Sequence, residues 1–281
     1  MNVKEIISSY EEQGLKNVDA IAKTCQDIIL YKISKSGFAK NATIKGGVVM
    51  MNLAKDNRRA TQDLDLDFIK YSLEETAIRV FIDKLNATDD NITLKIIGKI
   101  KPLKQQDYEW KRLNLIFMDE NEDQYKFKLD IGVHKNAKLE QEELCFDLHS
   151  SLESITLLVN SKEQIISEKL KSLLKLGRIS TRFKDIFDIY YLVTTKNIDE
   201  DKLKELITDY ILDDEIMREN TFKDIYSRLQ FIFSDELYIE KLSSSNNDWL
   251  EIPIDEVLQS ILEFFKNLDK TKVRCIIKQK P

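Results

Sequence analysis

The spacing of hydrophobic and polar positions changes near residue 160. Before it, segments with apolar residues at helical intervals are interspersed with segments in which apolar and polar residues alternate. The strands expected from these patterns cover residues 42–45, 63–69, 92–100, 109–118 and 124–133. The expected helices cover residues 3–12, 19–36 and 73–88, and one more begins at Gly46. Asp19 is placed to cap the second of these helices, and Gly37 to end it.

After residue 160 the alternation disappears and helical spacing dominates. The expected helices cover residues 161–177, 184–194, 200–212, 222–233, 235–244 and 254–268. Glycine is absent beyond Gly177, which is typical of a helical bundle. We therefore predict an α/β fold followed by an all-α one, with an α/β domain over residues 1–160 and a helical domain over residues 161–281. The polar run 243–248 is expected to be an exposed loop.

Three carboxylates alternate with apolar residues in the expected strand 63–69. Asp63, Asp65 and Asp67 share one face of that strand, and the intervening apolar residues share the other. Successive acids on one face lie roughly 7 Å apart between Cα atoms. Such a row is costly unless something positive lies among the acids, and Mg²⁺ typically takes one or two carboxylates together with substrate phosphates. We expect Asp67, the third acid, to be a solvent-facing strand end.

Two further features extend this acidic face. Gly46 and Gly47 follow the first strand, and a glycine pair at such a turn lets backbone N–H groups approach a phosphate closely. In the strand 124–133, Asp130 lies on the face opposite the apolar residues. If this strand pairs beside 63–69, Asp130 joins the carboxylate face. The other interpretation is an ordinary half-buried strand whose polar face happens to hold an aspartate.

The ordered set of motifs resembles the signature of the nucleotidyltransferase superfamily and, within it, the AbiEii/AbiGii toxin family of abortive-infection and type IV toxin–antitoxin systems. The resemblance spans residues 40–192. It rests on the Gly-Gly pair, the run Arg-Ala-Thr-Gln-Asp-Leu-Asp at 59–65, and segments 161–174 and 182–192, which are similar to the family's lysine-bearing and aspartate-bearing helices. The chain departs from the family pattern at Val48, where a hydroxyl-bearing residue is usual. The resemblance therefore implies that this chain relies more heavily on backbone N–H groups to bind the phosphates.

The family resemblance also implies a fold, a reaction and a set of site residues. The fold is a nucleotidyltransferase-like mixed sheet with flanking helices, followed by a C-terminal helical bundle that completes the active-site cleft. The reaction is Mg²⁺- or Mn²⁺-dependent transfer of a nucleotide from an NTP to an acceptor. The implied catalytic residues are Asp63, Asp65, Lys169 and Asp185, and the implied metal ligands are Asp63, Asp65 and Asp130. The implied nucleotide-binding residues are Gly46, Gly47, Lys45, Arg59, Thr61 and Lys169. Asp188, one helical turn after Asp185, is the alternative for the functional acid.

By resemblance, the acceptor is tRNA or another RNA, with a protein hydroxyl as an alternative. The resemblance also implies a cognate antitoxin, which in this type of system need not bind the toxin directly. The rival hypothesis is a nucleotide-binding sensor or interaction protein without transfer activity. The net charge of −6 argues against broad, nonspecific duplex binding but leaves room for RNA on a local basic patch. Candidate patches are Lys95, Lys99, Lys101 and Lys104; Lys169, Lys171, Lys175 and Arg178; and Lys266, Lys270, Lys272, Arg274, Lys278 and Lys280.

The amino-acid composition argues against several other kinds of site and against a membrane span. Two histidines are too few for a histidine-based zinc site, and they argue against a serine-type triad. The three cysteines are scattered in no metal spacing, and we expect them to be reduced in a cytoplasmic protein. No apolar run approaches the roughly 18 residues that indicate a membrane span.

Overall fold

The computed structural model describes residues 2–103, 110–133, 141–149, 152–244 and 248–270. Within it the chain divides into two compact units, Met1–Asn160 and Ser161–Pro281. Some residues singled out in the sequence lie outside the described ones. These are Lys104, the loop residues 245–247 and the basic residues of the tail beyond 270.

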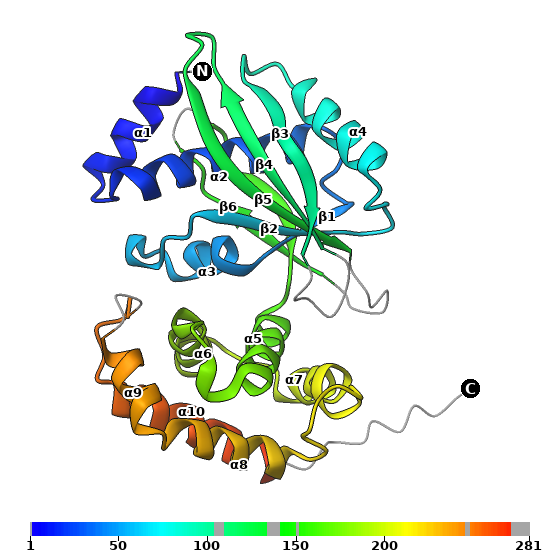
Figure 1. Ribbon diagram of the computed structural model, residues 1–281. Coiled ribbons are helices and arrows are strands. Elements are labelled where there is room, and N and C mark those ends of the chain that lie inside the picture. The colour runs from blue at the N-terminus through cyan, green and yellow to red at the C-terminus, as the bar shows by residue number, and fades with distance from the viewer. Residues whose placement is uncertain (1, 104–109, 134–140, 150–151, 245–247, 271–281) are drawn as a thin grey trace. The chain divides into compact units, whose positions relative to one another are not determined.

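The first unit is built on a seven-stranded mixed sheet with the order β3-β4-β5-β2-β1-β7-β6 (Figure 1). Its strands are β1 (Ala42–Lys45), β2 (Asp63–Phe68), β3 (Thr93–Pro102), β4 (Trp110–Met118), β5 (Gln124–Val133), β6 (Glu142–Phe146) and β7 (Ile155–Val159). β2 lies between antiparallel β1 and parallel β5, and β1 also pairs with parallel β7. The strands expected from the alternation are confirmed to within two residues at their ends. β6 and β7 were not predicted. β7 is a short, largely apolar run that periodicity does not mark as a strand.

The helices of this unit are α1 (Val3–Glu12), α2 (Asn17–Lys35), α3 (Gly46–Ala54) and α4 (Glu75–Asn86), with a 3₁₀ turn at Asn57–Arg59. α2 runs across the sheet and contacts β2, β5 and β7 (Figure 1). The predicted cap at Asp19 is wrong. α2 begins at Asn17, so Asp19 lies in the first turn. There its negative charge interacts favourably with the positive end of the helix dipole. The apolar face of β2 is fully buried beneath these helices, as the alternation predicted.

An ion pair lies inside this core between α2 and the segment after α4. The ammonium group of Lys32 donates to the Asp90 carboxylate at 2.7 Å, the Thr88 hydroxyl at 3.0 Å and the carbonyl of Ile92 at 2.8 Å. Burial lowers the pKa of Lys32, and the hydrogen bond and charge of Asp90 oppose that shift. The group is tolerated in the core because its donors and its charge are matched.

We expect Lys32→Met to lower the free energy of unfolding by about 3 kcal/mol, because it leaves Asp90 buried without its cation. Lys35→Met is the matched control on the same helix, since Lys35 pairs with Glu153 at the surface and should change stability little. Urea unfolding of both variants measures the difference. Equal stabilities would show that the buried pair contributes no more than the exposed one.

The second unit contains only helices in its described residues. They are α5 (Lys162–Leu176), α6 (Phe183–Thr195), α7 (Glu200–Ile207), α8 (Phe222–Phe233), α9 (Glu236–Ser243) and α10 (Ile254–Lys270), with a 3₁₀ turn at Gly177–Ile179 and a π-helical turn at Thr208–Leu212. α10 packs against α6 and α8, and α5 against α6 and α7. The predicted order of a mixed α/β sheet followed by a helical bundle is confirmed. No helix in the described part of the chain is long and apolar enough to span a membrane.

Candidate active site

The carboxylate face of the first unit extends across three neighbouring strands. Asp65 of β2 lies opposite Asp130 of β5, and Asp130 lies opposite Arg112 of β4. The strand 124–133 therefore does pair beside 63–69, which is the condition on which the place of Asp130 on this face depended. Because residues paired in register point to the same side of a sheet, Asp63, Asp65 and Asp130 share one face.

Arg112 supplies positive charge to this face, and the sequence analysis missed it. Its Nε and one terminal nitrogen donate to the two carboxylate oxygens of Asp130 at 2.7 and 2.6 Å. This bidentate bond raises the pKa of Arg112 against the opposing effect of burial, and the negative charges of Asp63 and Asp65 raise it further. The available signal was a lone arginine on the polar side of the strand 109–118. Only the strand order shows that it faces the acids.

The glycine pair lets the N-terminus of α3 approach the acidic strand closely. Gly46 has a φ of +64°, and a Cβ there would collide with the Asp65 carboxylate. A Cβ on Gly47 would lie 2.7 Å from the Thr61 side chain, whose hydroxyl donates to Asp63 at 3.0 Å. The first N–H groups of a helix have no partner within it and attract anions. The turn therefore places the N–H groups of a helix terminus beside two carboxylates.

Gly46→Ala should reduce stability by at least about 1 kcal/mol more than Gly37→Ala. Both glycines have positive φ, so both substitutions carry the strain of a left-handed residue, about 1–2 kcal/mol. A Cβ at Gly37 meets open space, whereas one at Gly46 must displace Asp65. Thermal unfolding of the two variants separates the collision from the strain. Equal losses would mean that Asp65 moves aside without cost.

Three expectations about charged residues of this region are wrong or gain no support: the exposure of Asp67 and the phosphate contacts of Lys45 and Arg59. Asp67 is not a solvent-facing strand end: it is 2% exposed and accepts a 2.8 Å bond from Lys45, itself buried over the Trp110 ring. Lys45 is therefore engaged inside the sheet, and its expected phosphate contact gains no support. Arg59 is also buried, so its expected phosphate contact gains no support either. Alternation predicts which face a residue takes, but not how deeply that face is covered.

The oxygen donors of this face decide whether it can hold a metal ion. Among the described residues no group of three or more His, Cys, Asp or Glu side chains is positioned to hold a metal ion. Asp130 has both oxygens bonded to Arg112, so it is already paired with a cation. Asp63 and Asp65 remain on one face beside the glycine turn, and two carboxylates fit the number that Mg²⁺ takes when phosphates complete its shell. The donor set thus fits a metal held by Asp63 and Asp65.

A second charged cluster lies in the helical unit. Lys169 of α5 forms ion pairs with Asp185 and Asp188, both on α6, the second at 2.9 Å. The Asp188 side chain is fully buried, whereas those of Asp185 and Lys169 are 16% and 11% exposed. Arg182 lies 4.0 Å from Asp185. The two candidate acids are therefore partners of the same lysine, and only Asp185 is reachable from solvent, which favours it over Asp188.

The first unit is a mixed sheet with paired carboxylates at a glycine turn. The second is a helical unit with a lysine–aspartate cluster. Together they are the two parts of the nucleotidyl transferase class that the sequence resemblance predicts. Residues 28–259 match the family described as Nucleotidyl transferase AbiEii toxin, Type IV TA system, and the chain belongs to this family. The family resemblance is thereby confirmed.

One similar solved structure is the crystal structure of an antigenic nucleotidyltransferase-like protein from Paracoccidioides brasiliensis, with 14% identity and a TM-score of 0.40. That alignment covers 76% of this chain and 93% of the other. No curated protein matches the sequence.

Proposed function

We propose that this toxin transfers a nucleotide from an NTP to an RNA acceptor, tRNA or another RNA, and that it requires Mg²⁺ or Mn²⁺. The observation that carries the proposal is the placement of Asp65 directly against Gly46 at the start of α3. This placement supports the proposal because a triphosphate substrate with its metal needs a carboxylate for the ion next to a helix terminus for the phosphates.

Asp63 and Asp65 are the proposed metal ligands. A metal bound there would neutralise the triphosphate and make its α-phosphorus more open to attack. Thr61 holds Asp63 in place through its hydroxyl, and the backbone N–H groups of Gly46 and Gly47 bind the β- and γ-phosphates. Arg112 holds Asp130 in a fixed position. We propose Asp130 as a third ligand only in a state where that pairing is broken.

Lys169 and Asp185 are proposed as the catalytic residues of the helical unit, on the strength of the family match over 28–259. Lys169 would offset the charge that develops on the leaving pyrophosphate. Asp185 would accept the proton of the acceptor hydroxyl or orient it. The salt bridge between these two residues holds the carboxylate and the ammonium group side by side. The toxin–antitoxin family also implies a cognate antitoxin as a partner.

The deciding experiment is a transfer assay with purified protein, Mg²⁺ and each α-labelled NTP. Total bacterial RNA and lysate protein serve as alternative acceptors, and an Asp63→Ala, Asp65→Ala double variant is the control. Label in one RNA size class, only with native carboxylates, supports the proposal and names the donor. Label on protein redirects the acceptor to a protein hydroxyl. Nucleotide binding without any transfer favours the non-catalytic sensor.

A further inference from the structure

The carboxylate face of the sheet continues from β2 across β5 and β4 to the edge strand β3 (Figure 1). Because residues paired in register point to the same side of a sheet, this face can be followed outward from the acids. The row that begins at Asp65 passes through Asp130 and Arg112 and ends at Lys101. The next two rows bring three more lysines to the same face: Lys128, Lys126 and Lys95.

These four lysines, here called the basic face (Lys95, Lys101, Lys126 and Lys128), are all exposed. Within the described residues none of them forms an ion pair. Asp130, the carboxylate of β5 on this side, is bonded to Arg112 instead. On β3, β4 and β5 this face therefore carries an excess of positive charge, although the net charge of the chain is −6.

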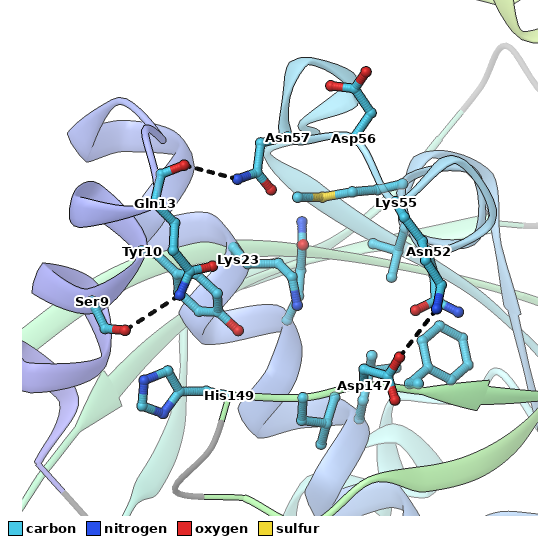
Figure 2. Close-up of a pocket in the computed structure, with 16 residues that line it drawn as sticks. Ser9, Tyr10, Gln13, Lys23, Asn52, Lys55, Asp56, Asn57, Asp147 and His149 are labelled. Atoms are coloured by element: carbon cyan, nitrogen blue, oxygen red, sulfur yellow. Dashed lines mark hydrogen bonds and ion pairs between the residues drawn. The ribbon is translucent and has the colours of Figure 1, made fainter.

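The lysines around a cavity elsewhere in the first unit are paired, in contrast to the basic face. The cavity has a volume of about 340 Å³ and is lined in part by residues of α1, α2 and α3 (Figure 2). Lys23 pairs there with the buried Asp27, and Lys55 pairs with Asp147 at 3.5 Å. These charges are matched within the chain, so the cavity does not attract an anion as the basic face does.

The basic patch of the helical unit, which the sequence offered as an RNA site, is also engaged. Lys171 donates to Asp214 at 2.6 Å, and Arg178 donates to Asp235 at 2.8 Å. A paired cation must give up its carboxylate before it contacts a phosphate. The basic face of the sheet carries no such cost, and it is therefore the better site for a polyanion.

Protection of the sheet edge explains only the lysines of β3. Lysines on an edge strand hinder pairing with the edges of other sheets, and β3 is such a strand. Lys126 and Lys128 lie on β5, which is paired on both sides, with β4 and with β2. Their partners on β4 are Ile116 and Asn114, neither of which neutralises a lysine. The two lysines of β5 therefore need another explanation.

The lysines of β5 also point the way to the acids. Lys126 and Lys128 are one strand repeat apart, roughly 7 Å between Cα atoms. Lys128 lies in register with Asp63 on the neighbouring strand. A chain of phosphates that follows these two lysines is thus led to the carboxylates of β2.

We propose that the basic face binds the sugar–phosphate backbone of the RNA acceptor and guides its reactive end to Asp63 and Asp65; this inference rests on the proposed transfer to RNA. Lysine contacts to phosphates position a nucleic acid without reading its sequence. The half-buried Ile97 and Ile116 lie between the lysines and offer apolar surface to riboses and bases. Protein–protein interfaces are depleted in lysine, which favours RNA over an acidic protein.

Fluorescence anisotropy with a labelled single-stranded oligoribonucleotide, without NTP or metal, tests the basic face in the full chain. The Lys95→Gln, Lys126→Gln double variant should bind the RNA about tenfold or more weakly than the native chain. Its plot of log K against log salt should be shallower by about 1.4, because each phosphate contact on a single strand contributes about 0.7. Lys16→Gln, Lys84→Gln removes the same charge from exposed positions at α2 and α4 and should bind as the native chain does.

A gain of binding gives an independent check. Asn114→Lys adds a cation in the middle of the face and should tighten RNA binding and steepen the salt dependence. Native affinity in the Lys95→Gln, Lys126→Gln variant, or an equal loss in the control, would overturn the proposal. Binding of poly-L-glutamate but not of RNA, lost in the same double variant, would assign the face to an acidic protein and would also overturn it.

The transfer assay separates a failure of this inference from a failure of the proposed function. If transfer to RNA occurs, the Lys95→Gln, Lys126→Gln variant should raise KM for RNA about tenfold or more and leave KM for the NTP unchanged. Transfer with a native KM for RNA would refute the basic face and keep the transferase. RNA binding that depends on these lysines, without transfer, would refute the transferase and keep the RNA surface.

Discussion

Asp65→Asn should lower the rate of nucleotidyl transfer by at least about a thousandfold and relieve growth arrest on expression, with the fold retained. Asparagine keeps the shape of the side chain that fills the space beside Gly46, so packing changes little. It removes one of the two carboxylate charges available to a metal, and stabilisation of transition-state charge by a metal is worth several kcal/mol. The measurement is a single-turnover transfer assay with labelled NTP.

The matched control is Asp83→Asn, an exposed aspartate on α4 outside the carboxylate face, which should transfer at the native rate. Binding of Mn²⁺ by each variant gives a second measurement that does not require turnover, and Asp65→Asn should bind the ion more weakly. Native transfer by Asp65→Asn would eliminate the metal role of this residue. Native metal binding with lost transfer would leave Asp65 a role in orienting substrate instead.

Lys169→Met should both abolish transfer and lower the free energy of unfolding by about 3–5 kcal/mol. It leaves two neighbouring aspartates in the helical unit without their shared cation, and one of them, Asp188, is fully buried. Urea unfolding measures the stability loss. Lys175→Met, exposed on the same helix, is the control and should match the native protein in stability.

A destabilised variant can lose activity simply because less of it is folded. A second substitution therefore separates the catalytic role of Lys169 from its structural role. Adding Asp188→Asn to Lys169→Met removes the buried unpaired charge and should recover part of the lost stability. Transfer should stay absent, since the ammonium group proposed to contact the phosphates is still missing. If transfer returned with stability, Lys169 would be a structural residue rather than a catalytic one.

Local pattern predicted most of the elements in both units. Strand periodicity placed Asp63 and Asp65 on one face because successive side chains of any strand point to opposite sides. The same rule gave Asp130 its face, and helical spacing predicted the helix 161–177, which matches α5 to within one residue at each end. The short strand β7 was not predicted, because a brief apolar run does not distinguish a strand from a buried helix.

By itself the sequence determined the order of elements, the acidic face and the family, since these depend on local geometry and on motifs in a fixed order. Only the tertiary structure decided the partners of the charges. Strand order brings Arg112 to Asp130 and buries Asp67 with Lys45. Register likewise places lysines of β3 and β5 on the carboxylate face, which no motif marks. Burial and ion pairing depend on neighbours distant in the chain, and for that reason periodicity could not predict them.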